Sequence, residues 1–348
     1  MDIPKKMKAA YMQGVGKITV EETDVPAPGN NELLIRVKAV GICGSDVHLF
    51  AHGGLGPFIV HPPYILGHEA SGEVAAVGSD VEGFTVGDKI TMEPGVPCGK
   101  CEHCRRGAYN LCPHVVFWAA PPVPGVLAEY ITHKAEFCYK VDPSVSFPTA
   151  SLAEPLSVGV YAAQRAIASP GKSVAVLGLG PIGQIAIQAL KSFGVTELFA
   201  SDILDNRVKA ATELGCKRVI NSAKTDILDE SKNFTDGKGF DIVVETAGAV
   251  PTTVQAVHIA KNGGMVVLVG NPPEEEPSFP VLEVVQREIT VTGSFRYANT
   301  YPTVVDILAA NENLPKLISH KFPLEKTQEA FELVRDKRNE CMKVVVEL

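Results

Sequence analysis

The sequence predicts an α/β protein of two domains, one rich in strands and one built on a parallel sheet. The first 150 residues contain many strand and turn signals and little helical periodicity. From about residue 151, short apolar strands alternate with amphipathic helices. The length of 348 residues is enough for two domains, each with a sizeable core.

In the first part, the clearest strand covers residues 32–40. Leu33, Ile35, Val37 and Ala39 alternate with charged residues, which predicts a half-buried strand. Glycine, proline and aspartate separate it from other candidates. Further strands are expected over 70–78, 88–92 and 128–141.

The second part begins with an apolar strand over 173–177. It leads into a glycine-rich turn and a helix over about 182–193, which ends at Gly194. Alternation at this spacing predicts parallel strands joined by crossover helices. The next expected strands are 197–201, 218–220, 241–245 and 265–269, with helices over 205–214 and 252–260. A mixed tail follows, with a strand near 288–295, helices after Thr300 and over 324–335, and a last strand over 342–348.

Composition and charge exclude several functional classes. Lys and Arg total 32 and Asp and Glu total 40, so the net charge is −8 and general binding to nucleic acid is not expected. The hydrophobic fraction of 45% excludes intrinsic disorder as the main state. The most apolar stretch, 173–190, is interrupted by Gly, Pro and Gln, so no membrane span is expected. A soluble cytoplasmic protein is the expectation.

The glycine-rich turn predicts a dinucleotide site. Gly178 permits a tight turn, Gly180 lets the backbone approach a pyrophosphate, and Gly183 lets helix and strand pack closely. The helix that opens near Ile182 offers free N–H groups to the phosphates. The alternative is a glycine turn that only packs a helix on a sheet, but the strand, helix and downstream acid together favour the cofactor.

That acid is Asp202, nineteen positions after Gly183, at the end of the second strand. Its carboxylate would accept hydrogen bonds from the ribose hydroxyls and repel a 2′-phosphate, so NAD is favoured over NADP. Arg207 weakens this preference, because a nearby arginine suits either cofactor.

Four of the eight cysteines fall within fifteen residues, as Cys98, Cys101, Cys104 and Cys112. Four thiolates at short spacing in a loop can wrap one tetrahedral zinc ion in a closed structural site. An iron–sulfur cluster is an alternative, but the last gap of seven residues does not fit the ferredoxin spacing. A nucleic-acid zinc ribbon fits the acidic chain poorly.

A second set of metal-ligand types is scattered along the chain, as Cys43, His68, Glu69 and Glu154. Each has an ordinary structural explanation, because a lone Cys is usually a buried apolar residue and a lone His is more often hydrogen-bonded structure. Spacing alone does not join them into one site.

A family resemblance does join them. The segments GICGSDVH, GHEASG, CGKCEHC, LAEPLSVG, GLGPIG and SFRYANTYP occur in this order. Together they resemble the zinc-dependent medium-chain dehydrogenase/reductase superfamily, in its sorbitol (polyol) dehydrogenase branch, over essentially the whole chain. The resemblance implies a GroES-like catalytic domain over 1–152 and 290–348, interrupted by a Rossmann domain over 153–289.

By that resemblance, Cys43 and His68 match zinc ligands. Glu69 matches a carboxylate that binds zinc directly or through water, and Glu154 matches a further carboxylate at the metal. Such an open site acts on a substrate hydroxyl as a Lewis acid. The superfamily's proton relay is matched by Ser45 and His48.

The resemblance also implies substrate contacts. Arg296 and Tyr297 would bind the remaining hydroxyls of a polyol, although Arg296 could instead form an ion pair that orients Glu154. Phe117 matches an aromatic residue that lines the pocket. Leu49 and Ala120 depart from the common family residues at their positions and leave the identity of the polyol open.

The implied activity is NAD- and zinc-dependent oxidation of a secondary alcohol of a polyol to a ketose, with sorbitol first and xylitol or galactitol next. One alternative is a zinc alcohol, butanediol or threonine dehydrogenase, which the segment FRYANTYP argues against. The other is a non-catalytic dinucleotide-binding protein, which predicts a depleted metal site. The family further suggests a homotetramer, by analogy only.

Overall fold

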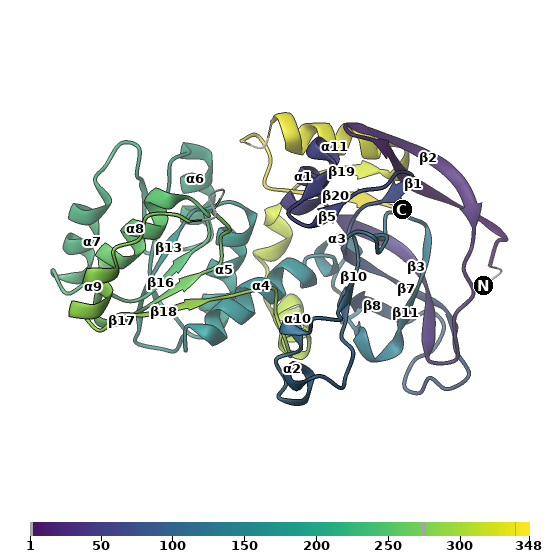
Figure 1. The fold of residues 1–348 in the computed structure, drawn as a ribbon, viewed down its shortest axis with the longest axis horizontal. Helices are drawn as coiled ribbons and strands as arrows, with labels where there is room; N and C mark the ends of the chain where they lie inside the picture. Colours follow the sequence, from purple (N-terminus) through teal and green to yellow (C-terminus); the bar gives the residue numbers. More distant parts are fainter. Residues whose placement is uncertain (1–2, 273–275, 338) are drawn as a thin grey trace. The chain divides into compact units, whose positions relative to one another are not determined.

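The computed structural model describes residues 3–272, 276–337 and 339–348. The chain divides into two compact units, one of residues 1–154 and 301–348 and the other of residues 155–300 (Figure 1). The expected domain boundary at 290 falls inside the second unit, because Thr290–Gly293 pairs with a strand of that unit.

The first unit is built around a seven-stranded sheet in the order β12-β8-β7-β3-β20-β19, with β11 also paired to β3 (Figure 1). Its strands are β3 (Glu32–Gly41), β7 (Glu69–Val77), β8 (Lys89–Met92), β11 (Tyr130–Lys134), β12 (Cys138–Lys140), β19 (Ile318–Pro323) and β20 (Lys343–Glu347). A second sheet pairs β1 (Lys6–Gly14) with β2 (Lys17–Asp24) and β6 (Tyr64–Ile65). Two strand pairs are shorter, β9 (Gly95–Val96) with β10 (Val116–Phe117) and β4 (Gly54–Leu55) with β5 (Phe58–Ile59).

The strand at 32–40 has the expected apolar face, because Leu33, Ile35, Val37 and Ala39 are all buried, whereas Arg36 on the other face is exposed. One expectation for this unit needs correction. The expected strand over 128–141 is two strands, β11 and β12, separated by the 3₁₀ turn Ala135–Phe137.

The helices of the first unit are short. They are α1 (Gly44–His52), α2 (Glu102–Arg105), α3 (Phe147–Ala150), α10 (Tyr301–Ala310) and α11 (Thr327–Asp336), with 3₁₀ turns at Tyr109–Leu111, Leu314–Leu317 and Leu324–Lys326. The apolar core lies between the strands, α1 and α11, where Phe50 of α1 packs on Phe331 of α11 with ring centroids 5.3 Å apart. The sequence did not predict α1, whose apolar periodicity is weak.

The second unit has the parallel sheet that the alternation predicts, in the order β15-β14-β13-β16-β17-β18. The strands are β13 (Ser173–Leu177), β14 (Glu197–Asp202), β15 (Arg218–Asn221), β16 (Phe240–Glu245), β17 (Ala260–Leu268) and β18 (Thr290–Gly293). Every pairing in it is parallel. The α/β class with a parallel sheet is therefore confirmed.

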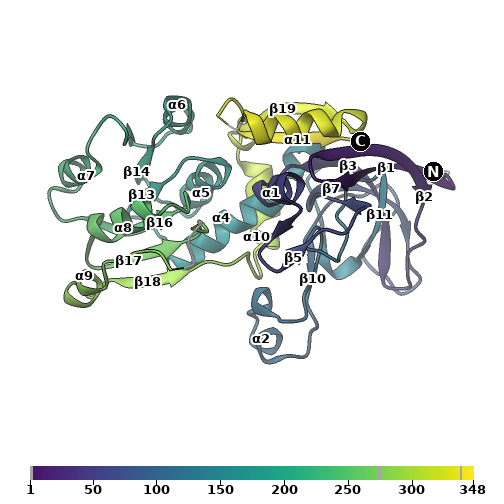
Figure 2. The same cartoon turned by 45° about the horizontal axis from the view of Figure 1, so that its top comes forward.

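Helices cover both faces of this sheet (Figure 2). They are α4 (Ala153–Arg165), α5 (Pro181–Ser192), α6 (Asp205–Glu213), α7 (Ile227–Thr235), α8 (Val250–Ile259) and α9 (Val281–Gln286). Val174 and Val176 of β13 pack with α4, α5 and α6, whereas Ala175 and Leu177 pack with α7 and α8. This alternation is the reason that the strands are apolar throughout. In the described part of the chain, no helix is both long and apolar enough to span a membrane.

Candidate active site and metal centres

Three predicted ligands meet at the junction of β3, α1 and β7. Cys43 precedes α1, His68 precedes β7, and Glu69 is its first residue. One donor atom from each lies within 4.8 Å of the other two. Glu154, in the first turn of α4, is 6% exposed but is not a member of this cluster. Its charge acts on the nearby Lys343 and Glu93.

Asp46 holds this junction together, and the sequence did not single it out. It is fully buried, and its carboxylate accepts hydrogen bonds from the backbone N–H of Cys43 at 3.3 Å and of Gly67 at 3.1 Å. The first bond caps α1, and the second ties that helix to the segment before His68. The only sequence signal was an aspartate three residues after a possible ligand.

Asp46 also acts on the imidazole of His68. Its Oδ2 lies 3.3 Å from Nδ1 of His68. Burial alone would lower the pKa of His68, but the Asp46 carboxylate and Cys43 raise it well above its usual value. A carboxylate beside a ligating histidine fixes the ring and makes it a better donor.

The cluster fits a metal ion. Nδ1 of His68 and Oε2 of Glu69 are buried, and each faces one ionisable side chain of the described residues, Asp46 at 3.3 Å and Lys343 at 2.5 Å. A thiolate, an imidazole and a carboxylate form the mixed set that zinc binds when it keeps a position open.

Lys343 of β20 is the second residue that the sequence missed. It is 3% exposed, and its Nζ lies 2.5 Å from the Glu69 carboxylate. Burial lowers the pKa of Lys343, but the charges of Glu69, Cys43 and Glu154 outweigh it, so the pKa is raised. The available signal was a lysine at the start of an otherwise apolar strand, Lys343–Glu347.

Helix α1 carries the expected proton relay. Ser45, in its first turn, is half-buried, and His48 is exposed. Nδ1 of His48 lies 2.9 Å from the carbonyl oxygen of Gly54, in the short pair β4–β5. If Nδ1 donates to that carbonyl, the neutral ring has its lone pair on Nε2.

Of the expected substrate residues, Phe117 lies beside the metal cluster, with its ring centroid 5.7 Å from that of His68. Arg296 and Tyr297 belong to the second unit, after β18. Tyr297 is buried, and Arg296 adopts a left-handed backbone conformation with φ of 51°. The Arg296 guanidinium lies over the ring of Phe295 at 5.0 Å.

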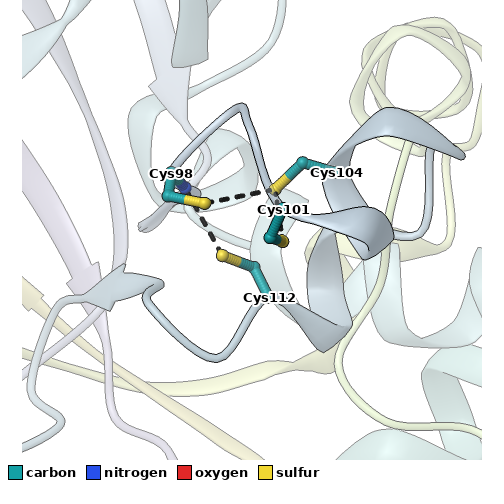
Figure 3. Close-up of side chains that lie close together, drawn as sticks. All are labelled: Cys98, Cys101, Cys104 and Cys112. Carbon is teal, nitrogen blue, oxygen red and sulfur yellow. Dashed lines mark hydrogen bonds between the residues drawn. The ribbon is translucent and has the colours of Figure 1, made fainter.

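The four cysteines of the first unit converge (Figure 3). Their sulfur atoms all lie within 4.8 Å of one another, with Cys101 and Cys104 at 3.4 Å. Cys104 stands on the four-residue helix α2, so the lobe is not wholly a loop, and Figure 2 shows it projecting from the strands of its unit. Backbone N–H groups lower the pKa of Cys98 to about 6, whereas burial and the neighbouring thiols raise the pKa of Cys104 to about 12. The Cys98 thiol therefore ionises readily and the Cys104 thiol does not. A cation that binds all four sulfurs would stabilise all of them as thiolates.

The glycine turn between β13 and α5 has one position that only glycine fits and one that faces open space. A Cβ on Gly183 would lie 1.9 Å from the carbonyl oxygen of Gly178, so only glycine fits. A Cβ on Gly180 would meet nothing closer than Nη1 of Arg207 at 3.8 Å, which leaves open space in front of the backbone. Ile182 lies in the first turn of α5.

Asp202, the last residue of β14, is hydrogen-bonded to this turn. It is 6% exposed, and its carboxylate accepts the backbone N–H groups of Leu179 at 2.7 Å and Leu204 at 3.0 Å. Nη1 of Arg207 lies 3.5 Å from Oδ2 of Asp202. Asp202 and Arg207, the two residues expected to set the preference between NAD and NADP, therefore form an ion pair.

Sequence comparisons identify the family. The family model "Alcohol dehydrogenase GroES-like domain" matches residues 29–143, and "Zinc-binding dehydrogenase" matches residues 181–310. The sorbitol dehydrogenase of Bacillus subtilis is 42% identical over 345 residues, which cover 99% of this chain and 98% of that protein.

Solved structures agree. An oxidoreductase/dehydrogenase of unknown specificity from Escherichia coli has a TM-score of 0.94 and 39% identity, covering 98% of this chain and 99% of the other. A zinc-binding dehydrogenase from Sinorhizobium meliloti, bound to NADP, has a TM-score of 0.91 and 28% identity, covering 99% of this chain and 100% of the other. This chain therefore belongs to the zinc-binding medium-chain dehydrogenases, in the sorbitol dehydrogenase branch.

Proposed function

We propose that this protein is a zinc-dependent oxidoreductase that transfers a hydride from a secondary hydroxyl of a polyol to NAD and releases a ketose. The cluster of Cys43, His68 and Glu69 carries the proposal, because it offers a complete donor set in a member of this family. Sorbitol is the first candidate substrate, as in the Bacillus subtilis relative, and xylitol is the next.

In this proposal, Cys43, His68 and Glu69 bind the catalytic zinc. Glu154 is a further carboxylate at the site. Zinc bound there would supply Lewis acidity to an oxygen in its open position. The four cysteines Cys98, Cys101, Cys104 and Cys112 hold a second, structural zinc.

Ser45 and His48 then carry the hydroxyl proton away from the site. The half-buried serine hydroxyl can accept one proton and donate another, so it can link a buried substrate to the exposed histidine. Nε2 of His48 accepts the proton, because Nδ1 is engaged with Gly54. Imidazole suits this step, because its neutral ring can accept a proton at one nitrogen while the other donates a hydrogen bond.

The cofactor would lie on the turn of Gly178, Gly180 and Gly183, with its phosphates at the start of α5. We propose NAD rather than NADP, because the buried carboxylate of Asp202 at the end of β14 would accept ribose hydroxyls and repel a 2′-phosphate. The relative from Sinorhizobium meliloti was solved with NADP, so the two cofactors are compared directly in the test below.

Arg296 and Tyr297 are proposed to contact the hydroxyls of the polyol away from the reacting carbon, and Phe117 to line the same site. A guanidinium forms strong, directional hydrogen bonds with such oxygens. We also propose a cytoplasmic homotetramer, on family analogy alone. Light scattering would then give four times the chain mass of 37.1 kDa.

The test is NAD reduction across a panel of sorbitol, xylitol, galactitol, 2,3-butanediol and threonine, with and without a chelator. We expect turnover with at least one polyol, loss of turnover with the chelator, and recovery with zinc. NADP is run in parallel. Turnover of 2,3-butanediol or threonine alone would contradict the polyol assignment, and an inactive protein that binds NAD would favour a non-catalytic role.

A further inference from the structure

Lys343 is a buried lysine whose charge has one main partner, the carboxylate of Glu69. Its Nζ lies 2.5 Å from both Oε1 and Oε2 of Glu69, and it donates a hydrogen bond to the carbonyl oxygen of Ile42 at 3.1 Å. Lys343 is 3% exposed and Glu69 is 1% exposed. The ammonium group therefore competes directly for a carboxylate of the metal cluster.

The sheet is built to allow this contact. β3 lies between β7, which carries Glu69, and β20, which carries Lys343. Gly41 of β3 is the register partner of Glu69. A Cβ at this position would lie 2.1 Å from Oε2 of Glu69 and 3.1 Å from Cε of Lys343. The lysine therefore reaches across the middle strand at a residue without a side chain.

Stability alone is a weak explanation for the pair. Removing two charges from water costs about as much as their attraction returns, and apolar residues of similar volume often serve better. The position of the pair suggests another role, because Glu69 has donor atoms within 4.8 Å of those of Cys43 and His68. Any metal held there shares Glu69 with Lys343.

We propose that Lys343 is a positioning residue that limits the donation of Glu69 to the metal and so keeps one coordination position exchangeable. This inference rests on the proposed zinc site. A carboxylate held by an ammonium group has less negative charge to offer a divalent cation. Without that restraint, Glu69 could bind the metal through both carboxylate oxygens and occupy the position that the substrate oxygen needs.

The test measures zinc affinity as well as activity. The labile zinc is removed, and zinc is titrated back against a chromophoric chelator in the wild type and in Lys343→Met. We expect zinc to bind the variant at least about tenfold more tightly, which is about 1.4 kcal/mol. We also expect kcat for the polyol to fall while the KM for NAD stays within about twofold. General damage to the site would weaken zinc binding instead.

A second pair of variants asks whether Lys343 acts through Glu69. Glu69→Gln and the double variant Glu69→Gln/Lys343→Met remove the carboxylate charge, and the double variant leaves neither charge buried alone. We expect Lys343→Met to shift zinc affinity much less when Glu69→Gln is already present. A shift of the same size in both backgrounds would mean that Lys343 acts on the metal only as a distant charge, and the proposal would be wrong.

Lys321→Met is the matched control. Lys321 lies on the neighbouring strand β19 and pairs with Glu347 at 3.2 Å, but both side chains are about half exposed. We expect it to change neither zinc affinity nor kcat. Weaker or unchanged zinc binding in Lys343→Met would overturn the inference. If the wild type takes up no labile zinc at all, the proposed function itself fails, which is a separate result.

Discussion

At the residue scale, Asp202 has a structural and a functional role in the same carboxylate. Its two oxygens hold the backbone on both sides, at Leu179 before α5 and at Leu204 after β14. Oδ1 still has a lone pair for a ligand hydroxyl, whereas Oδ2 also faces Nη1 of Arg207 at 3.5 Å. The carboxylate is therefore fixed in place before any cofactor arrives, which favours selective binding.

We predict that Asp202→Ala raises the KM for NAD by about tenfold or more and narrows the preference for NAD over NADP. The change removes charge-assisted hydrogen bonds and the repulsion of a 2′-phosphate together. Steady-state kinetics with both cofactors measures the effect. Asp205→Ala is the control, because Asp205 is exposed and pairs with Lys224. An unchanged NAD/NADP ratio in Asp202→Ala would exclude Asp202 as the selecting residue.

Arg296 allows a test of substrate class. If it binds hydroxyls away from the reacting carbon, Arg296→Ala should lower kcat/KM for sorbitol by at least about tenfold, since each charge-assisted hydrogen bond contributes about 1.5–3 kcal/mol. A simple alcohol such as 2-butanol lacks those hydroxyls and should be little affected. The ratio of the two losses is the quantity to compare. A ratio near one would mean that Arg296 acts by orienting Glu154.

The sequence was informative about residues with distinctive chemistry and short spacing. The four cysteines and the three glycines lie in local motifs, and the structure brings each group together. The sequence did not predict the role of Asp46, which depends on its complete burial, or that of Lys343, whose partner is far along the chain. Lys343 and Glu69 are 274 residues apart, and no spacing pattern can show that they meet.

At the scale of elements, the end of β8 has a buried carboxyl group. Glu93 follows this strand and is 2% exposed, and the hydroxyl of Tyr139 on β12 donates to its Oε2 at 3.3 Å. Burial raises the pKa of Glu93 to about 7, although Tyr109 and Tyr139 partly oppose it. The folded protein therefore prefers this carboxyl group protonated.

We predict that Glu93→Gln raises the melting temperature at pH 8 and leaves it nearly unchanged at pH 4. The folded-state pKa of Glu93 lies above its ordinary value of 4.5, so its favourable contribution is complete below 4.5 and is lost as the pH rises through 7. The ionised group then costs at most about 3 kcal/mol. Thermal unfolding at several pH values tests this, with exposed Glu82→Gln as the control. The same change at both pH values would contradict it.

The cysteine lobe, residues 98–112, would be stabilised mainly by a metal bound to its four cysteines rather than by buried apolar residues. Helix α2 has only four residues and none of them is buried. We predict that Cys98→Ser lowers the melting temperature by several degrees but leaves kcat of the surviving folded fraction within about threefold, because it breaks a closed metal site. Cys216→Ser is the control, because Cys216 is a buried cysteine of the second unit that belongs to neither cluster. Lost activity with an unchanged melting temperature would contradict a structural role.

Local periodicity predicted the strands of the second unit and helices α5, α6 and α8, with α5 beginning one residue early, but it missed α4, α7 and α9. Its strands and helices alternate with clear boundaries. The first unit was harder, because α1 and α3 are short and are defined by caps and packing. Helix α1 begins directly after Cys43, because Asp46 caps it there, and that information lies in two polar residues rather than in an apolar stripe.

At the scale of the whole molecule, the first unit is assembled from both ends of the chain. β20, near the C-terminus, pairs with β3 in the main sheet, and it carries Lys343 to the metal cluster. The three donor residues of the cluster lie within residues 43–69, but the buried partner of Glu69 is supplied only when the last strand is in place. The four-cysteine lobe, in contrast, takes all its ligands from residues 98–112. The two metal centres therefore depend on the fold in different ways.

This difference predicts two zinc ions per chain with different lability. A zinc ion on the Cys43 cluster would have mixed donors, a shared carboxylate and an open position that a chelator can enter, whereas one in the lobe would be enclosed by four sulfurs. Elemental analysis should give about two zinc ions per chain, and a mild chelator should remove one of them and abolish turnover while the melting temperature falls little. Harsher chelation should then remove the second and unfold the protein, because binding free energy at a structural site is folding free energy. One zinc per chain, iron in the lobe, or simultaneous loss of both metals would contradict this division, and zinc added after the mild step should restore activity in full.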